Sequence, residues 1–98
     1  MEKILVSNQK MEIDLVNATV SFKDLKKTSL TTVELKILLC LMEEGGRLTS
    51  YDKLYKQVWG WPCNDNNAIL NTNIYRIRQK IGKEKIKGVR GVGYYLNV

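Results

Sequence analysis

Short stretches of alternating apolar and polar residues occupy the first 30 positions of the chain. Alternation with a period of two is typical of strands that bury one face of a sheet. Turn-forming Asn, Asp and Ser residues separate the stretches and allow the chain to reverse direction. The pattern therefore predicts a four-stranded antiparallel sheet, with strands at residues 4–6, 11–15, 19–22 and 26–30.

From residue 31 onward the apolar spacing changes to three and four, which is typical of helices that bury one stripe. The first predicted helix begins at the Thr-x-x-Glu sequence of residues 31–34, a capping box, and ends at two consecutive glycines. The second begins after Ser50 and ends at Gly60. The third spans residues 67–81, and its buried stripe consists of Leu70, Ile74, Ile77 and Ile81.

Two more strand-like segments, at 86–89 and 94–98, end the chain. The Arg-Gly-Val-Gly sequence of residues 90–93 joins them and predicts a hairpin, because glycine adopts the backbone angles of a tight turn. The chain is thus predicted to be an α+β protein. Its 98 residues are enough for a single domain with three parts: an N-terminal sheet (1–30), a three-helix core (31–82) and a hairpin (83–98).

The composition argues against several classes of function. The chain contains no histidine, which excludes a Ser-His-Asp triad and histidine metal ligands. No nucleophile–base pair takes its place, so we expect neither an enzyme nor a bound cofactor. The longest apolar run, residues 37–42, is far shorter than the roughly 20 residues of a membrane span. Cys40 lies within that run and Cys63 lies in a polar loop, so we expect two reduced thiols in a cytoplasmic protein without membrane contact.

The net charge of +6 is confined to one half of the chain. Residues 1–49 carry seven basic and seven acidic side chains, for a net charge of 0, whereas residues 50–98 carry nine and three, for +6. A one-sided basic surface is typical of proteins that bind a polyanion, either nucleic acid or an anionic membrane. A mild basic excess also serves solubility alone, so the charge by itself does not decide between these roles.

A helical projection of residues 67–81, at roughly 100° per residue, separates the buried stripe from a polar surface. Ile69 lies beside Arg76 on one flank of this surface. The surface contains no acidic residue, and its side chains are Thr72, Asn73, Tyr75, Arg76, Arg78 and Gln79. Arginine pairs with guanine, Asn and Gln pair with adenine, and a Thr methyl packs against thymine, so this helix is suited to the major groove of DNA. The alternative is an ordinary solvated helix face.

Four sequence motifs, in order along the chain, resemble those of one protein family. They are Leu-Thr-Thr-Val-Glu-Leu at 30–35, Ser-Tyr-Asp-Lys-Leu at 50–54 followed by Val-Trp-Gly at 58–60, Ile-Tyr-Arg-Ile-Arg-Gln-Lys-Ile at 74–81, and Val-Arg-Gly-Val-Gly-Tyr at 89–94. Each motif is weak alone, but with the N-terminal strands the four cover essentially the whole chain. The chain resembles the C-terminal effector domain of the OmpR/PhoB family of two-component response regulators.

The resemblance implies a winged helix-turn-helix fold, with three helices, an N-terminal four-stranded antiparallel sheet and a C-terminal hairpin called the wing. It implies sequence-specific binding to double-stranded promoter DNA for transcription regulation, usually by a head-to-tail pair. A receiver domain, which is absent from this chain, would carry the phosphorelay control in a longer protein. The loop between the second and third helices would contact RNA polymerase, through Trp61, Asn64, Asp65 and Asn66.

The resemblance also implies DNA contacts of individual residues. Arg76 would contact a base in the major groove, and Arg90 at the tip of the wing would enter the minor groove. From the helix surface and the resemblance together, further contacts are expected of Thr72, Asn73, Tyr75, Arg78, Gln79, Lys87 and Tyr94. Three positions depart from the family pattern: Tyr51 replaces an arginine, Asn71 an aspartate and Gly88 a threonine. A winged helix that has lost DNA binding and contacts another protein is the alternative function.

Overall fold

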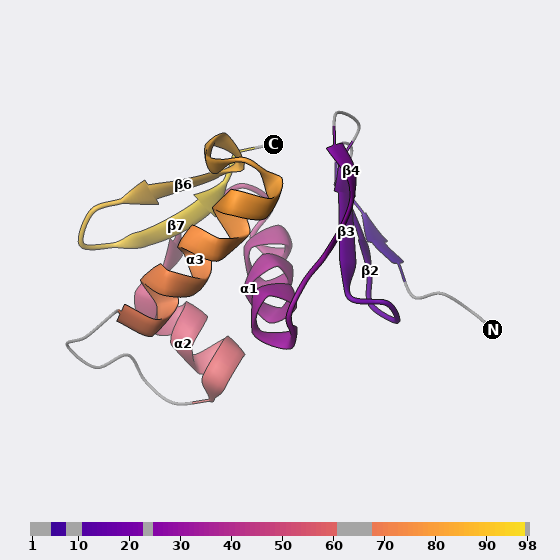
Figure 1. Cartoon of the computed structure of the whole chain (residues 1–98). Coiled ribbons are helices and arrows are strands. Elements are labelled where there is room, and N and C mark those ends of the chain that lie inside the picture. Colours follow the sequence, from indigo (N-terminus) through magenta and orange to yellow (C-terminus); the bar gives the residue numbers. More distant parts are fainter. Residues whose placement is uncertain (1–4, 8–10, 23–24, 61–67, 98) are drawn as a thin grey trace.

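Three helices lie between two antiparallel sheets in the computed structural model, which describes residues 5–7, 11–22, 25–60 and 68–97. Figure 1 shows the N-terminal sheet on one side of the helices and the C-terminal hairpin on the other. The predicted four N-terminal strands, three helices and C-terminal hairpin are confirmed.

The N-terminal sheet is a meander in the order β1-β2-β3-β4. Its strands are β1 (Leu5–Ser7), β2 (Met11–Asp14), β3 (Thr19–Phe22) and β4 (Leu25–Ser29). Alternate residues of β2 and β3 enter the core, where Ile13 pairs with Val20 and both are 0% exposed. One face of the sheet is therefore buried, as the period-two pattern predicts.

The helices are α1 (Thr32–Glu43), α2 (Tyr51–Trp59) and α3 (Ala68–Ile81). The capping box of α1 is present, because the Glu34 amide donates to Thr31 Oγ1 and the Thr31 amide donates to the Glu34 carboxylate. At the start of α2 the Lys53 amide donates to Ser50 Oγ, and the helix ends at Gly60, whose φ is 84°. No helix in the described ranges combines the length and the apolar character that a membrane span requires.

The core is built around the aliphatic stripe of α3, as predicted. The members of this stripe are at most 1% exposed: Leu70, Ile74, Ile77 and Ile81. Cys40 of α1 lies in the same core, and burial raises the pKa of its thiol to about 11. Cys40 therefore packs as an apolar residue with an unreactive thiol, while Cys63 lies outside the described residues.

The C-terminal sheet has three strands in the order β5-β7-β6. They are β5 (Thr49–Ser50), β6 (Ile86–Val89) and β7 (Gly93–Leu96), and the short helix η1 (Lys83–Lys85) connects α3 to β6. The sequence predicts the last strand at 94–98, whereas it covers 93–96, so the hairpin turn shortens to residues 90–92. The sequence does not predict β5, because two residues are too few to show alternation. Its pairing with β7 attaches the hairpin to the start of α2.

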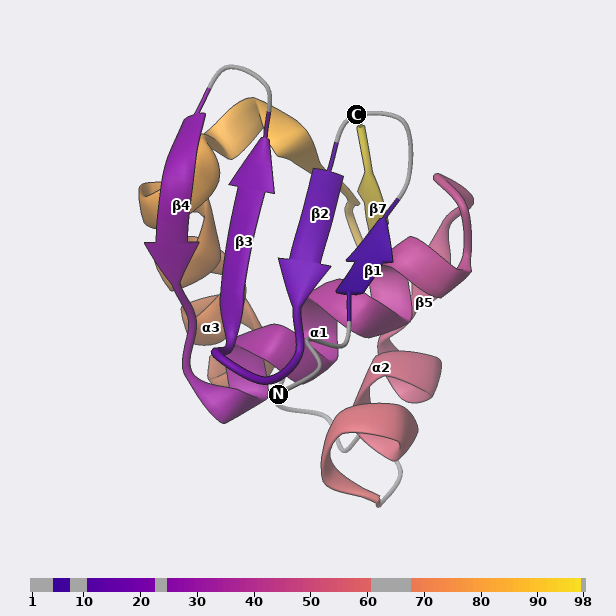
Figure 2. The same ribbon diagram turned by 90° about the vertical axis from the view of Figure 1, so that its right-hand side faces the viewer.

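The N-terminal sheet covers the helices on the side away from the hairpin. Figure 2 shows its strands in front of α1, with part of α3 behind β3 and β4. Lys85 Nζ lies 4.8 Å from the centre of the Phe22 ring, a cation–π contact that joins η1 to β3. The sheet leaves the polar surface of α3 uncovered, because its central residues Thr72, Tyr75 and Arg76 are exposed.

Candidate nucleic-acid interface

The polar surface of α3 is the first part of the candidate interface. Thr72, Arg76 and Gln79 are exposed, and Tyr75 is 62% exposed. α3 contains no acidic residue. Within the described part of the chain, Arg76 has no hydrogen-bond or ion-pair partner, so its guanidinium is free to bind a ligand.

Asn73 lies at the edge of this surface and is half-buried. Its Nδ2 donates to the backbone oxygen of Ile69 at 2.9 Å. This hydrogen bond uses one amide proton and leaves the side-chain oxygen and the other proton for a further partner. The amide is thereby held beside Ile69 on α3.

Arg78 holds the wing against α3. Its Nε and Nη2 donate to the backbone oxygen of Ile86 at 3.0 and 2.9 Å. Its guanidinium carbon also lies 5.5 Å from the centre of the Tyr94 ring. The sequence places Arg78 on the flank of the polar surface, and the structure adds a bond to the first residue of β6 that the sequence does not indicate.

Tyr94 connects the wing to the start of α3. Its hydroxyl donates to Asn71 Oδ1 at 2.7 Å, and its ring makes an edge contact with Tyr51 at 6.0 Å between centroids. Burial is the main cause that raises the pKa of Tyr94, so the hydroxyl stays protonated and acts as a donor. Two of the three departures from the family pattern, Tyr51 and Asn71, thus contact the same tyrosine.

The third departure, Gly88, faces the same ring. A Cβ at this position would lie 3.1 Å from Cε1 of Tyr94, which is tighter than an ordinary van der Waals contact. The missing side chain therefore lets the Tyr94 ring lie close to β6. All three residues thus lie against Tyr94: Tyr51 from α2, Asn71 from α3 and Gly88 from β6.

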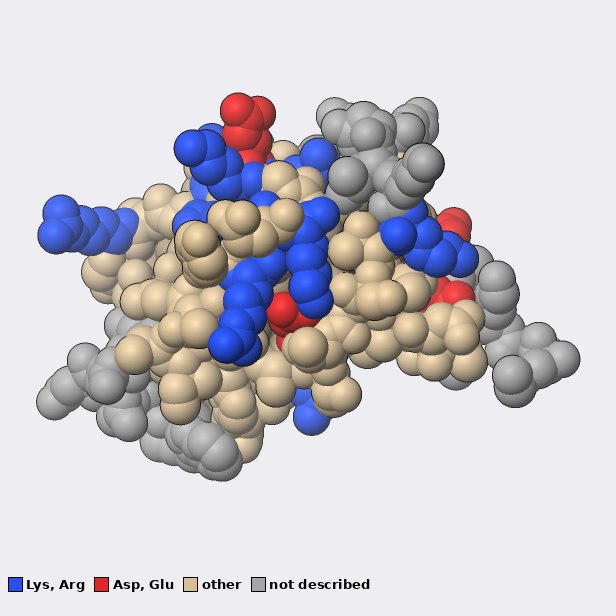
Figure 3. All heavy atoms as spheres, in the orientation of Figure 1, with Lys and Arg blue, Asp and Glu red and all other residues tan. Residues whose placement is uncertain are grey.

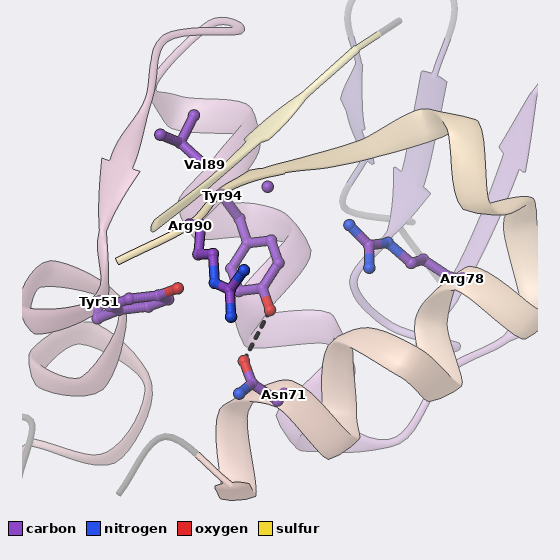
Figure 4. Close-up of a pocket in the computed structure, with 7 residues that line it drawn as sticks. Tyr51, Asn71, Arg78, Val89, Arg90 and Tyr94 are labelled. Atoms are coloured by element: carbon purple, nitrogen blue, oxygen red, sulfur yellow. Dashed lines mark hydrogen bonds between the residues drawn. The ribbon is translucent and has the colours of Figure 1, made fainter. Parts of the chain in front are cut away.

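An open hollow of about 340 Å³ separates the start of α3 from the wing. Figure 4 shows that Tyr94 points across it toward Asn71, and that Arg78 and Arg90 approach it from α3 and the wing. The lining residues are Tyr51, Asn71, Arg78, Gly88, Val89, Arg90 and Tyr94. Two arginines from separate elements thus border one concave surface, which favours an anionic ligand.

The basic side chains gather over α3 and the wing. Figure 3 shows blue Lys and Arg atoms concentrated there, with one basic side chain reaching beyond the tip of the hairpin. Arg90 begins the tip turn and is exposed, while Lys87 in β6 is half-buried. Neither has a hydrogen-bond or ion-pair partner among the described residues. Basic side chains from α3 and the wing thus lie on the same face of the molecule, although other atoms separate the one at the hairpin tip from the rest (Figure 3).

Lys80 differs from the other basic residues of α3 and the wing because it forms an ion pair within the protein. Its Nζ donates to Glu34 Oε1 at 2.6 Å, and the Glu34 side chain is 1% exposed. Burial opposes ionisation of Glu34, but hydrogen bonds from Lys80 and from the Thr31 amide outweigh it and hold the pKa of that carboxyl below its usual range. The pair joins α1 to α3 and neutralises Lys80, so this lysine supports the interface without adding to its charge.

The structure does not test the predicted contacts with RNA polymerase. The residues expected to contact RNA polymerase, Trp61, Asn64, Asp65 and Asn66, lie outside the described residues. No group of three or more His, Cys, Asp or Glu side chains that could hold a metal ion occurs in the described ranges. Among the described residues, the candidate interface consists of the polar surface of α3 and the wing.

The arrangement defines a class of protein. α2 and α3 follow α1 as a helix-turn-helix, and the β6–β7 hairpin lies beside α3 as a wing. This is a winged helix-turn-helix. The model of the family "Transcriptional regulatory protein, C terminal" matches residues 25–96, and the chain belongs to this family.

Individual relatives agree with this assignment. Transcriptional regulatory protein VxrB of Vibrio cholerae is 33% identical over 92 residues, which cover 94% of this chain and 36% of VxrB. The DNA-binding domain of RstA from Klebsiella pneumoniae, solved in complex with the RstA box, has a TM-score of 0.80 at 26% identity and covers 94% of this chain and 95% of that chain. The OmpR/PhoB homologue DrrB of Thermotoga maritima has a TM-score of 0.75 at 31% identity, over 96% of this chain and 44% of that chain. The chain thus spans less than half the length of VxrB and DrrB.

Proposed function

We propose that this chain binds specific sequences of double-stranded DNA and regulates transcription as the effector domain of a two-component response regulator. The observation that carries the proposal is the exposed surface of α3, which has hydrogen-bonding side chains and no acidic residue. An α-helix of roughly 10–12 Å diameter fits the major groove, which is about 12 Å wide. The RstA domain, which shares the fold, was solved in complex with its RstA box.

The proposed contacts follow from the exposed groups. Arg76 pairs with guanine O6 and N7 in the major groove, and Gln79 is placed for an adenine. Arg90 enters the minor groove, where a narrow groove concentrates negative potential. Arg78 and Tyr94 act mainly by holding the wing at a fixed position relative to α3, because their polar groups already bind Ile86 and Asn71.

The family resemblance supports further proposals about the cellular location, the partners and the control of this domain. Residues 1–98 act as a single DNA-binding domain in the cytoplasm, on promoter DNA, and as a head-to-tail pair. Trp61, Asn64, Asp65 and Asn66 contact RNA polymerase, and phosphorylation of a receiver domain outside this chain controls the activity. DNA with two half-sites about one helical turn apart is the expected target.

Selection from a random duplex pool tests the proposal. We expect enrichment of a defined sequence, whose affinity falls about 10- to 100-fold between roughly 50 and 200 mM salt, because phosphate contacts release counterions. Electrophoretic mobility shift or fluorescence anisotropy measures this dependence. A pool without enrichment, together with salt-insensitive binding, would instead support the protein-contacting alternative.

Replacement of Arg76 tests the base contact. Arg76→Ala is expected to weaken binding by about 1–3 kcal/mol and to relax selectivity at one base-pair position, because a bidentate pair is lost. The matched control is Lys27→Ala, which removes one positive charge from exposed β4 in the N-terminal sheet. Affinities of both variants are compared on the selected duplex and on duplexes changed at single positions. Unchanged selectivity in Arg76→Ala would remove this residue from the base-reading role.

A further inference from the structure

Ile69 is an unusual residue on α3. The helix has five Leu and Ile residues, of which four are at most 1% exposed, whereas Ile69 is 56% exposed. A single exposed aliphatic residue is common on protein surfaces and needs no explanation by itself. Ile69, however, lies beside the hydrogen-bonding side chains of α3 that are proposed to contact DNA, and this position indicates a role in binding.

Ile69 lines a shallow hollow of about 280 Å³ with four neighbours on the same helix, Ala68, Thr72, Asn73 and Arg76. Positions 69, 72 and 76 are separated by three and then four residues, so they form one stripe along α3. The Asn73 amide is tied to the Ile69 backbone oxygen and flanks this stripe. The hollow therefore has methyl groups at the start of the helix and a free guanidinium two turns later.

The major groove of DNA offers one apolar group, the C5-methyl of thymine. Ile69 is suited to this group because a β-branched side chain has restricted χ1 rotation and loses little freedom on contact. Seven residues of helix rise about 10 Å, which equals roughly three base-pair steps of 3.4 Å. The hollow thus matches a thymine methyl at one end and a guanine at the other.

We propose that Ile69, with the Thr72 methyl beside it, contacts the C5-methyl of a thymine about three base pairs from the guanine that Arg76 binds. The inference rests on the proposed function and deepens it, because it makes Ile69 a residue that determines sequence specificity. It also assigns the target a thymine at a stated distance from a guanine.

Replacement of thymine by deoxyuridine tests this contact, because it removes the C5-methyl and leaves the pairing unchanged. Each thymine of the selected duplex is replaced singly. With the unmodified protein, we expect one replacement to weaken binding about fourfold, the loss that corresponds to one buried methyl. In Ile69→Ala, affinity for the thymine duplex falls roughly 5- to 10-fold, and the same deoxyuridine then has a smaller effect, because only the Thr72 methyl still contacts the thymine.

Val16→Ala is the matched control, because Val16 is 44% exposed in the turn between β2 and β3. It is expected to keep both the affinity and the full deoxyuridine effect. Absence of any methyl-sensitive thymine, or an equal deoxyuridine effect in Ile69→Ala, would overturn the inference while DNA binding stands. Failure to select any duplex would instead overturn the proposed function, and this inference with it.

Discussion

Gly93→Ala is expected to destabilise the protein by at least about 3 kcal/mol, a large part of the roughly 5–15 kcal/mol that stabilises a domain of this size. A Cβ at Gly93 would lie 1.8 Å from the backbone oxygen of Thr49, 2.7 Å from its carbonyl carbon and 2.9 Å from Cα of Ser50. These are backbone atoms of β5, which cannot rotate away as a side chain does. The alanine would therefore force β5 and β7 apart and detach the wing from the start of α2.

Thermal unfolding followed by circular dichroism measures this effect. Gly91→Ala is the matched control, because Gly91 has a φ of 78° in the same hairpin but a Cβ there would meet no atom within 4 Å. Only backbone strain opposes that substitution, at a cost of about 1–2 kcal/mol. At roughly 4–8 °C per kcal/mol, Gly93→Ala should lower the Tm by about 12–24 °C, which is about 1.5 to 3 times the shift of the control. Equal shifts in the two variants would show that the contact with β5 does not restrict residue 93.

The helices and their caps are predictable because the interactions that define them are local. The capping box joins Thr31 to Glu34, three residues apart, and the stripe of α3 repeats every three or four residues. β5 is not predictable, because two residues become a strand only when β7 supplies their hydrogen bonds. The sequence also does not reveal that position 93 requires glycine, because the residue that a Cβ there would meet, Thr49, is 44 positions away.

In the candidate site, too, the sequence predicts the features that depend on local interactions but not those that depend on distant ones. The sequence predicts which side of α3 is exposed, because helical period alone separates Arg76 from the buried stripe. The sequence does not predict which polar side chains form hydrogen bonds within the protein and which remain available to DNA. Arg78 binds the backbone of Ile86, and Tyr94 binds Asn71 across 23 positions, so their roles depend on how the wing packs.

The ion pair between Glu34 and Lys80 spans 46 positions and leads to the second large expected effect. Glu34→Ala is expected to cost about 3 kcal/mol at neutral pH, because it removes a buried partner of the Lys80 ammonium and of the Thr31 amide. Urea unfolding measures the loss. Thr31→Ala is the matched control, because it removes the hydroxyl cap and leaves the ion pair, at a cost of about 1 kcal/mol.

The pH dependence separates the charge of Glu34 from its packing. The folded state lowers the pKa of this carboxyl, so its ionisation adds stability above about pH 4.3, the usual value for Glu, and this stability is lost as pH falls through the folded pKa. Glu34→Gln keeps the shape of the side chain without the charge. The variant should therefore be less stable than the unmodified protein at pH 7, and the difference should shrink as the pH is lowered below about 4. A difference that stays constant from neutral to acidic pH would show that the charge of Glu34 does not stabilise the contact between α1 and α3.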